Sequence, residues 1–481
     1  MGDLDFKVIF SGFNEGNSPL AHVDSKTFVG NRGQASSMKA DIISKPGFLT
    51  QGPALVALTN GTQAGVVDQL IRFILDEATA TDTTYGVGTT KLFKISSTAV
   101  ATGGTPSWPQ AITNMTEGES VIKLKTNVYV FFNKATGGDI AKMPIATEVV
   151  DHTWGSVADQ VLEKAPHPSA VKEDIMLFGN GQYVGSYVEG LAILDCRKLN
   201  FYEGAEVADI VFHANMWWIA VNYGGGKRGQ IYMYDGSAIS NILSDETGIG
   251  DQEIGFLYVK NGVLFVAYND LSSSTFSIGI LVGREIVPKR YFSGSLPNHR
   301  QKTLYMNTLM FISSNEMWSF GASVNQLPLQ ISKLASGGLA TVGALATPFG
   351  TPMIASTDGA TNHQLMKFSG YAVDSTWKSV FVNISDGRLI GKIDTIIVKS
   401  KALGENATCS ISLEGNQDSA TAGDTSNVLV YTGTLKTREV FTTVMMNAVE
   451  DLRLFIDFSG SDATNDCPIR EVVCLGTYAE R

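Results

Sequence analysis

Residues 209–235 read DIVFHANMWWIAVNYGGGKRGQIYMYD, and this stretch shows the pattern that decides the fold. It contains an apolar run, a short polar turn, a second apolar run, a glycine-rich loop and a third apolar run. Val, Ile, Trp and Tyr dominate these runs, and such residues are enriched in β-strands. The stretch therefore predicts a small antiparallel sheet rather than a helical segment.

The same form recurs along the chain. Clear copies are residues 119–143, 174–195 and 253–283, and weaker copies are residues 70–96, 303–321 and 344–369. The closing strand of each unit starts near Leu92, Ile140, Leu191, Ile231, Phe276, Met317 and Leu365. These starts lie about 45 residues apart, which is typical of β-propeller blades. We predict a propeller of about seven blades (six to eight) over residues 38–370, because the repeats of an elongated β-solenoid are usually shorter and more uniform.

A ring of blades must be closed between its first and last members. Propellers often close when an N-terminal strand completes the final blade. Residues 38–43 (MKADII) precede the first full unit and are predicted to do this.

The pattern becomes denser after Gly370. Residues 371–481 are predicted to form a separate β-sandwich, jelly-roll-like in kind. Alternating apolar residues such as Leu452, Leu454 and Ile456 would face its core. The expected strands are residues 377–384, 390–399, 407–414, 427–433, 440–446, 452–458 and 469–478.

Near the N-terminus, residues 11–37 are rich in Gly, Asn and Ser and carry few periodic apolar positions. Such a segment is expected to be an extended N-terminal arm (residues 1–37) that becomes ordered on a partner. Its candidate partner-binding residues are Phe13, Asn14, Pro19, Leu20, Val23 and Phe28.

Charge and cysteine content restrict the class of protein. Lys and Arg total 36 and Asp and Glu total 47, a net charge of −11. This balance argues against a nucleic-acid coat, although DNA could pass an acidic wall without adhering. The four scattered cysteines do not suggest a disulfide scaffold. We find no secretory signal and no apolar run near the roughly 18 residues of a membrane-spanning helix.

No catalytic motif is evident. The acids Asp139, Asp195 and Asp235 flank predicted closing strands, where Asp commonly serves turns. The six histidines show no metal-binding spacing, and the glycine-rich loop 224–229 lacks the order of a phosphate-binding loop. We therefore predict no enzyme activity, no catalytic residue, no cofactor and no metal.

The layout resembles that of propeller-type structural proteins of tailed-bacteriophage virions, above all tail nozzle or hub components. The resemblance lies in the opening arm SGFNEGNSPLAHVDSKTF (residues 11–28), the following segment MKADIISKPGFLTQGPALVAL with its Pro46-Gly47 turn, and degenerate blades followed by a sandwich. It implies a protein made in the host cytoplasm and located in the virion tail. Its partners would be copies of itself in a cyclic oligomer and other tail proteins, with genome DNA only in passing and no membrane insertion.

Three alternatives remain open. One is a propeller that binds a host receptor or glycan through its sandwich. The second is a propeller glycosidase or lyase with a carbohydrate-binding sandwich, which would need at least two acids clustered at the propeller centre. The third, a WD-repeat scaffold, is disfavoured because GH and WD dipeptides do not recur at the blade period.

Overall fold

The computed structural model describes residues 6–11, 13, 22–24, 34–38, 40–41, 47–155, 162–191, 193–224, 228–241, 252–270, 274–306, 308–314, 316–320, 328–333, 341–358, 362–379, 381–384, 389–415, 428–442, 446–458 and 464–480. These residues form strands and turns, with a 3-10 turn at Glu189–Leu191 (η2), and none of them is α-helical. No helix in this part of the chain could therefore cross a membrane. The predicted all-β class is confirmed.

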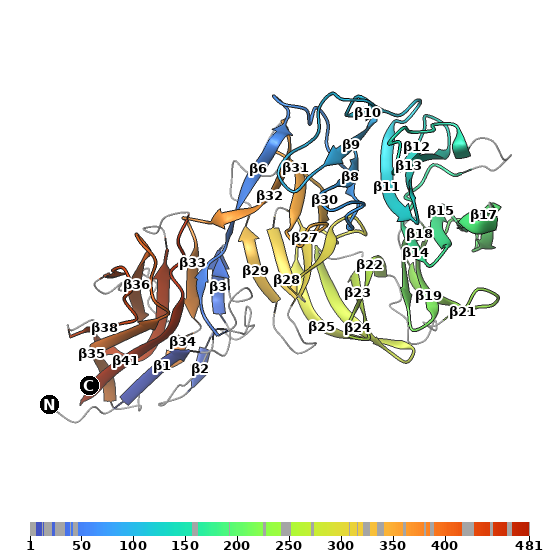
Figure 1. Cartoon of the computed structure of the whole chain (residues 1–481). Helices are drawn as coiled ribbons and strands as arrows, with labels where there is room; N and C mark the ends of the chain where they lie inside the picture. The colour runs from blue at the N-terminus through green and yellow to red at the C-terminus, as the bar shows by residue number, and fades with distance from the viewer. Residues whose placement is uncertain are drawn as a thin grey trace.

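Seven small antiparallel sheets follow one another and form the blades of a propeller (Figure 1). Blade one contains β7 (Phe73–Ile74), β8 (Thr84–Val87), β9 (Lys91–Ile95) and β10 (Gln110–Ala111), blade two contains β11 (Glu117–Leu124), β12 (Asn127–Asn133) and β13 (Gly138–Pro144), and blade three contains β14 (Ser169–Lys172), β15 (Ile175–Asn180), β16 (Tyr183–Val188) and β17 (Ile193–Asn200). Blade four contains β18 (Glu206–His213), β19 (Met216–Tyr223), β20 (Arg228–Tyr234) and β21 (Ile239–Asn241), and blade five contains β22 (Gln252–Lys260), β23 (Val263–Asp270), β24 (Thr275–Val282) and β25 (Glu285–Ser293). Blade six contains β26 (Lys302–Tyr305), β27 (Thr308–Ser313), β28 (Glu316–Phe320) and β29 (Pro328–Lys333), and blade seven contains β30 (Val342–Ala346), β31 (Met353–Thr357), β32 (His363–Tyr371) and β6 (Pro53–Thr62).

The first strand of each blade lies near the axis. β7 contacts both β11 and β30, and further contacts join β11 to β14, β14 to β18, β18 to β22, and β26 to β30. Most of the strands that the sequence predicted to close a blade are the third strand of that blade. The fourth strand, which lies outermost in the sheet, was not predicted. Outermost strands such as β10 (QA) and β21 (ISN) are short and polar, so their sequence gives little strand signal.

β6 closes the ring by pairing antiparallel with β32 of the seventh blade. An N-terminal strand therefore closes the ring as expected, but residues 38–43 were the wrong segment. Met38 ends β3 (Gln34–Met38), which pairs with β33, and β4 (Ala40–Asp41) pairs with β5 (Thr50–Gln51). β6 is longer and pairs along β32 from Tyr371 to Gln364, so it occupies the edge of the seventh blade.

Two further sheets form the sandwich beside the propeller (Figure 1). One contains β1 (Phe6–Ser11), β41 (Ile469–Glu480), β35 (Leu389–Ser400), β38 (Arg438–Phe441) and β39 (Met446–Val449). The other contains β2 (His22–Asp24), β34 (Phe381–Asn383), β40 (Asp451–Asp457), β33 (Thr376–Ser379), β3, β36 (Thr408–Gly415) and β37 (Leu429–Thr432).

The N-terminal strands belong to this sandwich, which corrects the prediction of a separate arm over residues 1–37. β1 pairs antiparallel with β41 over its whole length, β2 pairs parallel with β34, and β3 pairs antiparallel with β33. The sandwich is thus built from both ends of the chain, and the propeller is inserted between them.

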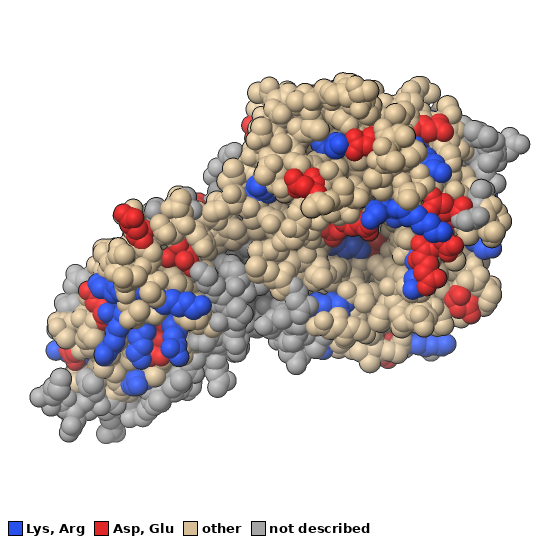
Figure 2. All heavy atoms as spheres, in the orientation of Figure 1, with Lys and Arg blue, Asp and Glu red and all other residues tan. Residues whose placement is uncertain are grey.

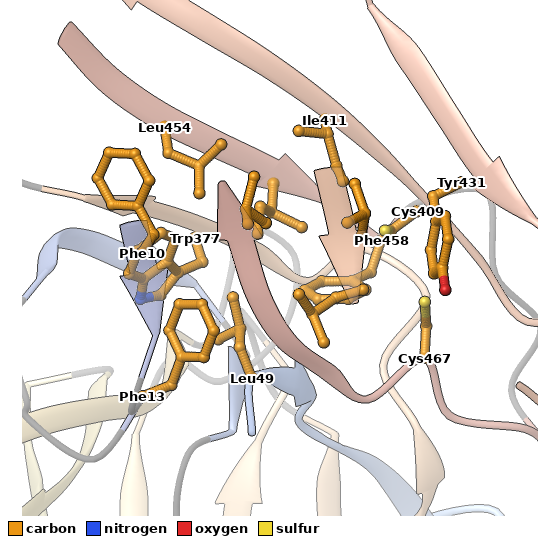
Figure 3. Close-up of a cluster of buried hydrophobic side chains, with 14 of the residues drawn as sticks. Phe10, Phe13, Leu49, Trp377, Cys409, Ile411, Tyr431, Leu454, Phe458 and Cys467 are labelled. Atoms are coloured by element: carbon orange, nitrogen blue, oxygen red, sulfur yellow. The ribbon is translucent and has the colours of Figure 1, made fainter. Parts of the chain in front are cut away.

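A single hydrophobic core fills the sandwich and continues into the last two blades. Phe10, Phe13, Trp377 and Leu454 meet at its centre (Figure 3). The same cluster includes side chains of blades six and seven, namely Met310, Ile312, Met317, Val342, Leu345, Ile354, Met366 and Phe368. All four cysteines are buried and free, and Cys409 lies beside Cys467 in this core (Figure 3).

Candidate functional site: a charged cavity on the propeller axis

The innermost strands surround a cavity of about 300 Å³. Figure 2 shows a hollow on the propeller with acidic and basic side chains at its rim. Its lining comes from six of the seven blades, because each blade presents its first strand to the axis. The lining residues are Phe73, Ile74, Asp76, Ser169, Asp209, Ile210, Val211, Phe212, Leu257, Tyr258, Val259, His299, Arg300, Lys302 and Leu345.

A buried ion pair joins blades four and six across this cavity. Lys302 Nζ contacts Asp209 Oδ2 and also donates to the backbone carbonyl of Leu257. The Lys302 and Asp209 side chains are only 13 % and 5 % exposed. Asp209 also accepts hydrogen bonds from the backbone N–H of Leu257 (2.7 Å) and of Ile210 (2.9 Å). Burial raises the pKa of Asp209, and the Lys302 ammonium opposes that rise.

A second ion pair lies beside the first. Arg300 Nη1 is 3.4 Å from Glu119 Oε2, and Asn133 Nδ2 donates to Glu119 Oε1 at 3.1 Å. Burial raises the pKa of Glu119 to about 7, because loss of solvation outweighs the attraction of the Arg300 guanidinium. Glu119 therefore changes protonation near neutral pH.

Asp76 is the third carboxylate at the axis, and hydroxyl groups hold it. Thr303 Oγ1 donates to Asp76 Oδ2 at 2.8 Å, and Thr347 donates to Oδ1 through its N–H and, at 3.1 Å, through its Oγ1. Partial loss of solvation beside the surrounding protein raises the pKa of Asp76 despite these hydrogen bonds, and the residue itself is still exposed to solvent. Thr303 and Thr347 belong to or adjoin the first strands of blades six and seven, so Asp76 links blade one to both.

His299 completes the polar lining. It is 9 % exposed, its ring lies 6.2 Å from that of Phe73, and its Nε2 has no hydrogen-bond partner among the described residues. Burial and the neighbouring Arg300 lower the pKa of His299 far below 6.5, so the imidazole is neutral at neutral pH. The His299 ring also forms a hydrogen bond with the backbone of Glu119, and this bond favours the protonated ring. Because Nε2 has no partner, the nitrogen that donates to the Glu119 backbone is Nδ1. Nε2 is then an acceptor without a donor.

Sequence reasoning missed this cluster because its members are far apart in the chain. Glu119 and Asp209 each stand near the start of an apolar run (ESVIKL and DIVFH) in their respective repeats. An acidic residue at the same position in two repeats could have indicated the cluster, since the first strand of every blade faces the axis. Arg300 and Lys302, next to His299, gave no comparable signal.

The acids noted from the sequence lie elsewhere. Asp139 is buried in β13 and pairs with Lys134 at 3.0 Å. Asp195 accepts from the backbone N–H of Arg197 (3.0 Å), and Asp235 accepts from the N–H groups of Ser237 and Ala238, both at 2.7 Å. Asp195 and Asp235 therefore serve local turns, and none of the three lines the axial cavity.

The candidate partner-binding arm is not brought together as a surface. Phe13 is completely buried in the core of its own chain, so it is not available to a partner. Val23 lies in β2, paired in parallel with Val382 of β34. Asn14, Pro19, Leu20 and Phe28 lie outside the described residues. In the described part of the chain, no group of three His, Cys, Asp or Glu side chains could hold a metal ion.

No family model and no curated protein matches this chain. Solved structures similar to it include PorZ, a surface component of the type-IX secretion system of Porphyromonas gingivalis, at 12 % identity and a TM-score of 0.42, covering 69 % of this chain and 38 % of that one. The extracellular domain of a putative one-component system from B. thetaiotaomicron is similar at 10 % identity and a TM-score of 0.47, and the match covers 79 % of this chain and 47 % of that one. An aldose sugar dehydrogenase from Streptomyces coelicolor is similar at 10 % identity and a TM-score of 0.37, covering 65 % and 97 %. The chain thus spans less than half the length of the first two.

Proposed function

We propose that the protein is a non-enzymatic structural component of a tailed-bacteriophage virion, of the tail nozzle or hub kind. It assembles with copies of itself into a ring and contacts neighbouring tail proteins. The proposal combines the layout of the sequence with the mechanical character of the fold.

The uninterrupted core between the propeller and the sandwich carries this proposal. Met310 of blade six and Phe368 of blade seven share one buried cluster with Trp377 and Phe13 of the sandwich. Two domains that share a core move as one body, whereas domains joined by a polar interface move relative to one another. A rigid unit of this kind suits a protein whose task is to hold shape in a particle.

DNA would pass through the ring of subunits and not through a single propeller. The axial cavity measures about 300 Å³. A compact cavity of that volume is narrower than the major groove of DNA alone, which is about 12 Å wide. A duplex therefore does not fit into it.

The sandwich offers a surface for neighbouring proteins. Lys7, Lys392 and Lys399 lie on the outer face of the β1–β41–β35–β38 sheet, at positions that alternate with buried residues, and Arg438 is the β38 partner of Lys399. Lys392 and Lys399 are paired with Asp394 and Glu471, which leaves Lys7 and Arg438 as the excess positive charge of these six residues. Figure 2 shows a group of basic side chains on the sandwich. Because the whole chain carries a net charge of −11, this basic face would attract an acidic surface on a copy of the chain or on another tail protein.

The test is the assembly state of the full chain, measured by native mass spectrometry and electron microscopy. We expect a cyclic oligomer of fixed stoichiometry, and Lys7→Glu with Arg438→Glu should weaken its association about tenfold or more. Arg284→Glu, in the exposed β24–β25 turn, is the matched control and should assemble normally. A chain that stays monomeric at every concentration, alone and with tail proteins, would contradict the proposal.

A glycoside hydrolase is the second candidate, because Asp76 and Asp209 line the axial cavity and the pKa of Glu119, the partner of the lining residue Arg300, is raised to about 7, a value that suits a general acid. Its test is the hydrolysis of aryl glycosides by the full chain and by Glu119→Gln. Turnover that is lost in Glu119→Gln would favour this candidate over the structural role. The absence of turnover on every substrate would remove it.

A further inference from the structure

The axial cavity has the size and walls of a small-molecule site. Pockets for small ligands span about 300–1,000 Å³ and combine apolar walls with a few convergent polar groups. This cavity measures about 300 Å³, the lower end of that range. Phe73, Phe212, Leu257 and Tyr258 give it apolar and aromatic surface, and the charged residues described above stand among them.

The two cations of the cavity are already matched by carboxylates. Lys302 is paired with Asp209, and Arg300 is paired with Glu119. Asp76 has its hydrogen bonds from Thr303 and Thr347. An anionic ligand would have to draw Lys302 or Arg300 out of one of these buried pairs and leave its carboxylate uncompensated, which is strongly unfavourable. A cationic ligand would lie beside both of these cations. A neutral ligand leaves every pair in place.

Polar groups in the lining still lack partners. The Nε2 acceptor of His299 and the Nε–H donor of Arg300 are buried and have no hydrogen bond among the described residues. Burial raises the pKa of Tyr258, so its phenol stays protonated and can donate or accept. Buried polar atoms without partners are unusual in folded proteins, and a bound molecule with hydroxyl groups would satisfy both the acceptor and the donor.

We propose that the axial cavity binds a small, uncharged, hydroxyl-rich molecule of about the size of a monosaccharide. One hydroxyl donates to His299 Nε2, an oxygen accepts from Arg300, and the apolar face of the ligand packs on the aromatic side chains. The proposal stands apart from the virion role, because a structural protein and a host-recognition protein could both carry such a site.

Isothermal titration calorimetry on the full chain tests it. The probes are glucose, galactose, xylose, N-acetylglucosamine and myo-inositol, with glucuronate and glucosamine as charged counterparts. We expect saturable binding of at least one neutral probe, at one site per chain, and at least about tenfold weaker binding of its charged counterpart. His299→Leu should reduce affinity about tenfold or more, the equivalent of one lost hydrogen bond of about 1.4 kcal/mol.

Two further variants keep the test decisive. His363→Leu, at the start of β32 and outside the cavity, is the matched control and should bind as the wild type does. If His299→Leu fails to fold, Tyr258→Phe removes only a hydroxyl and should also weaken binding. Failure of every neutral probe to bind, tighter binding of the charged probes, or unchanged affinity in the variant that folds would each overturn the proposal. None of these results bears on whether the chain assembles into a ring.

Discussion

Phe13 packs edge-on against Trp377, with ring centroids 5.2 Å apart and an interplanar angle of 87°. One residue comes from the start of the chain and the other from the first strand after the propeller. Both are completely buried, and edge-to-face pairs of aromatic rings add to the hydrophobic contribution of burial. The sandwich therefore needs its N-terminal residues to complete its core.

Replacing Phe13 with Ala should lower the free energy of unfolding by about 3–5 kcal/mol, the usual cost of a large aromatic deletion in a core. Urea denaturation followed by tryptophan fluorescence measures this change. Lys7→Ala is the matched control, since Lys7 lies exposed on the same N-terminal segment and should cost less than about 0.5 kcal/mol. Equal losses in the two variants would show that the N-terminal segment does not stabilise the sandwich.

The Lys302–Asp209 pair should be far more sensitive to substitution than a surface pair. Asp209→Asn leaves a buried Lys302 without its counter-charge, and the expected loss is about 3–5 kcal/mol. Adding Lys302→Met should recover part of that loss. Asp174→Asn is the control, because its pair with Lys125 spans 3.5 Å with both side chains nearly half exposed, and it should cost about 0–1 kcal/mol. Similar costs at both sites in denaturant titrations would contradict the inferred burial.

Glu119 should make stability depend on pH near neutrality. Its folded-state pKa of about 7 lies above the ordinary value of 4.5, so between these values the folded state holds more protons than the unfolded state. The contribution of Glu119 to stability is therefore full below about pH 4.5 and is lost as pH rises toward 7, at about 1.4 kcal/mol for each pH unit between the two pKa values. Glu119→Gln removes this dependence.

The measurement is the difference in unfolding free energy between wild type and Glu119→Gln across that pH range. The free energy of unfolding of the wild type, relative to that of Glu119→Gln, should fall as pH rises. Glu203→Gln, an exposed substitution, should leave the pH profile unchanged and serves as the control. Parallel profiles for the wild type and Glu119→Gln would show that this carboxyl titrates normally.

Local sequence patterns predicted the repeated blades, because each blade keeps its apolar strands close together in the chain. Residues 209–235 contain most of β18 together with β19 and β20 of a blade, and the predicted strand at residues 452–458 corresponds to β40. Such signals depend on neighbours a few residues away, so they can be read without knowing the tertiary structure.

Long-range pairings could not be predicted in the same way. β3 reads QASSM, a weak strand sequence, and it becomes a strand only because Trp377 and its neighbours in β33 provide a partner more than 300 residues later. The axial cluster has the same origin. Glu119 and Arg300 meet only after the ring closes, and no local pattern indicates that they belong together.

Four blades share a β-bulge in the innermost strand. The register skips Glu119 in β11, Ala208 in β18, Gly255 in β22 and Gly343 in β30. Bulges of this kind bend a strand and redirect side chains, here where the strands converge on the axis. Since Ala208 carries a Cβ at this position, the bulge itself does not require glycine.

At Gly255 and Gly343, glycine is required because the adjacent blade comes close to the bulge. A Cβ on Gly255 would lie 2.1 Å from the carbonyl oxygen of Pro297, and a Cβ on Gly343 would lie 2.1 Å from that of Ile71. Both obstacles are backbone atoms, which cannot turn aside as a flexible side chain can. Gly255→Ala and Gly343→Ala should therefore push adjacent blades apart and each lower the free energy of unfolding by about 1–3 kcal/mol. Ala208→Gly, the control at the equivalent bulge, should cost at most about 1 kcal/mol. Thermal and urea unfolding of the three variants decides the matter: glycine variants as stable as the wild type would mean that the blades are not in the close contact described here.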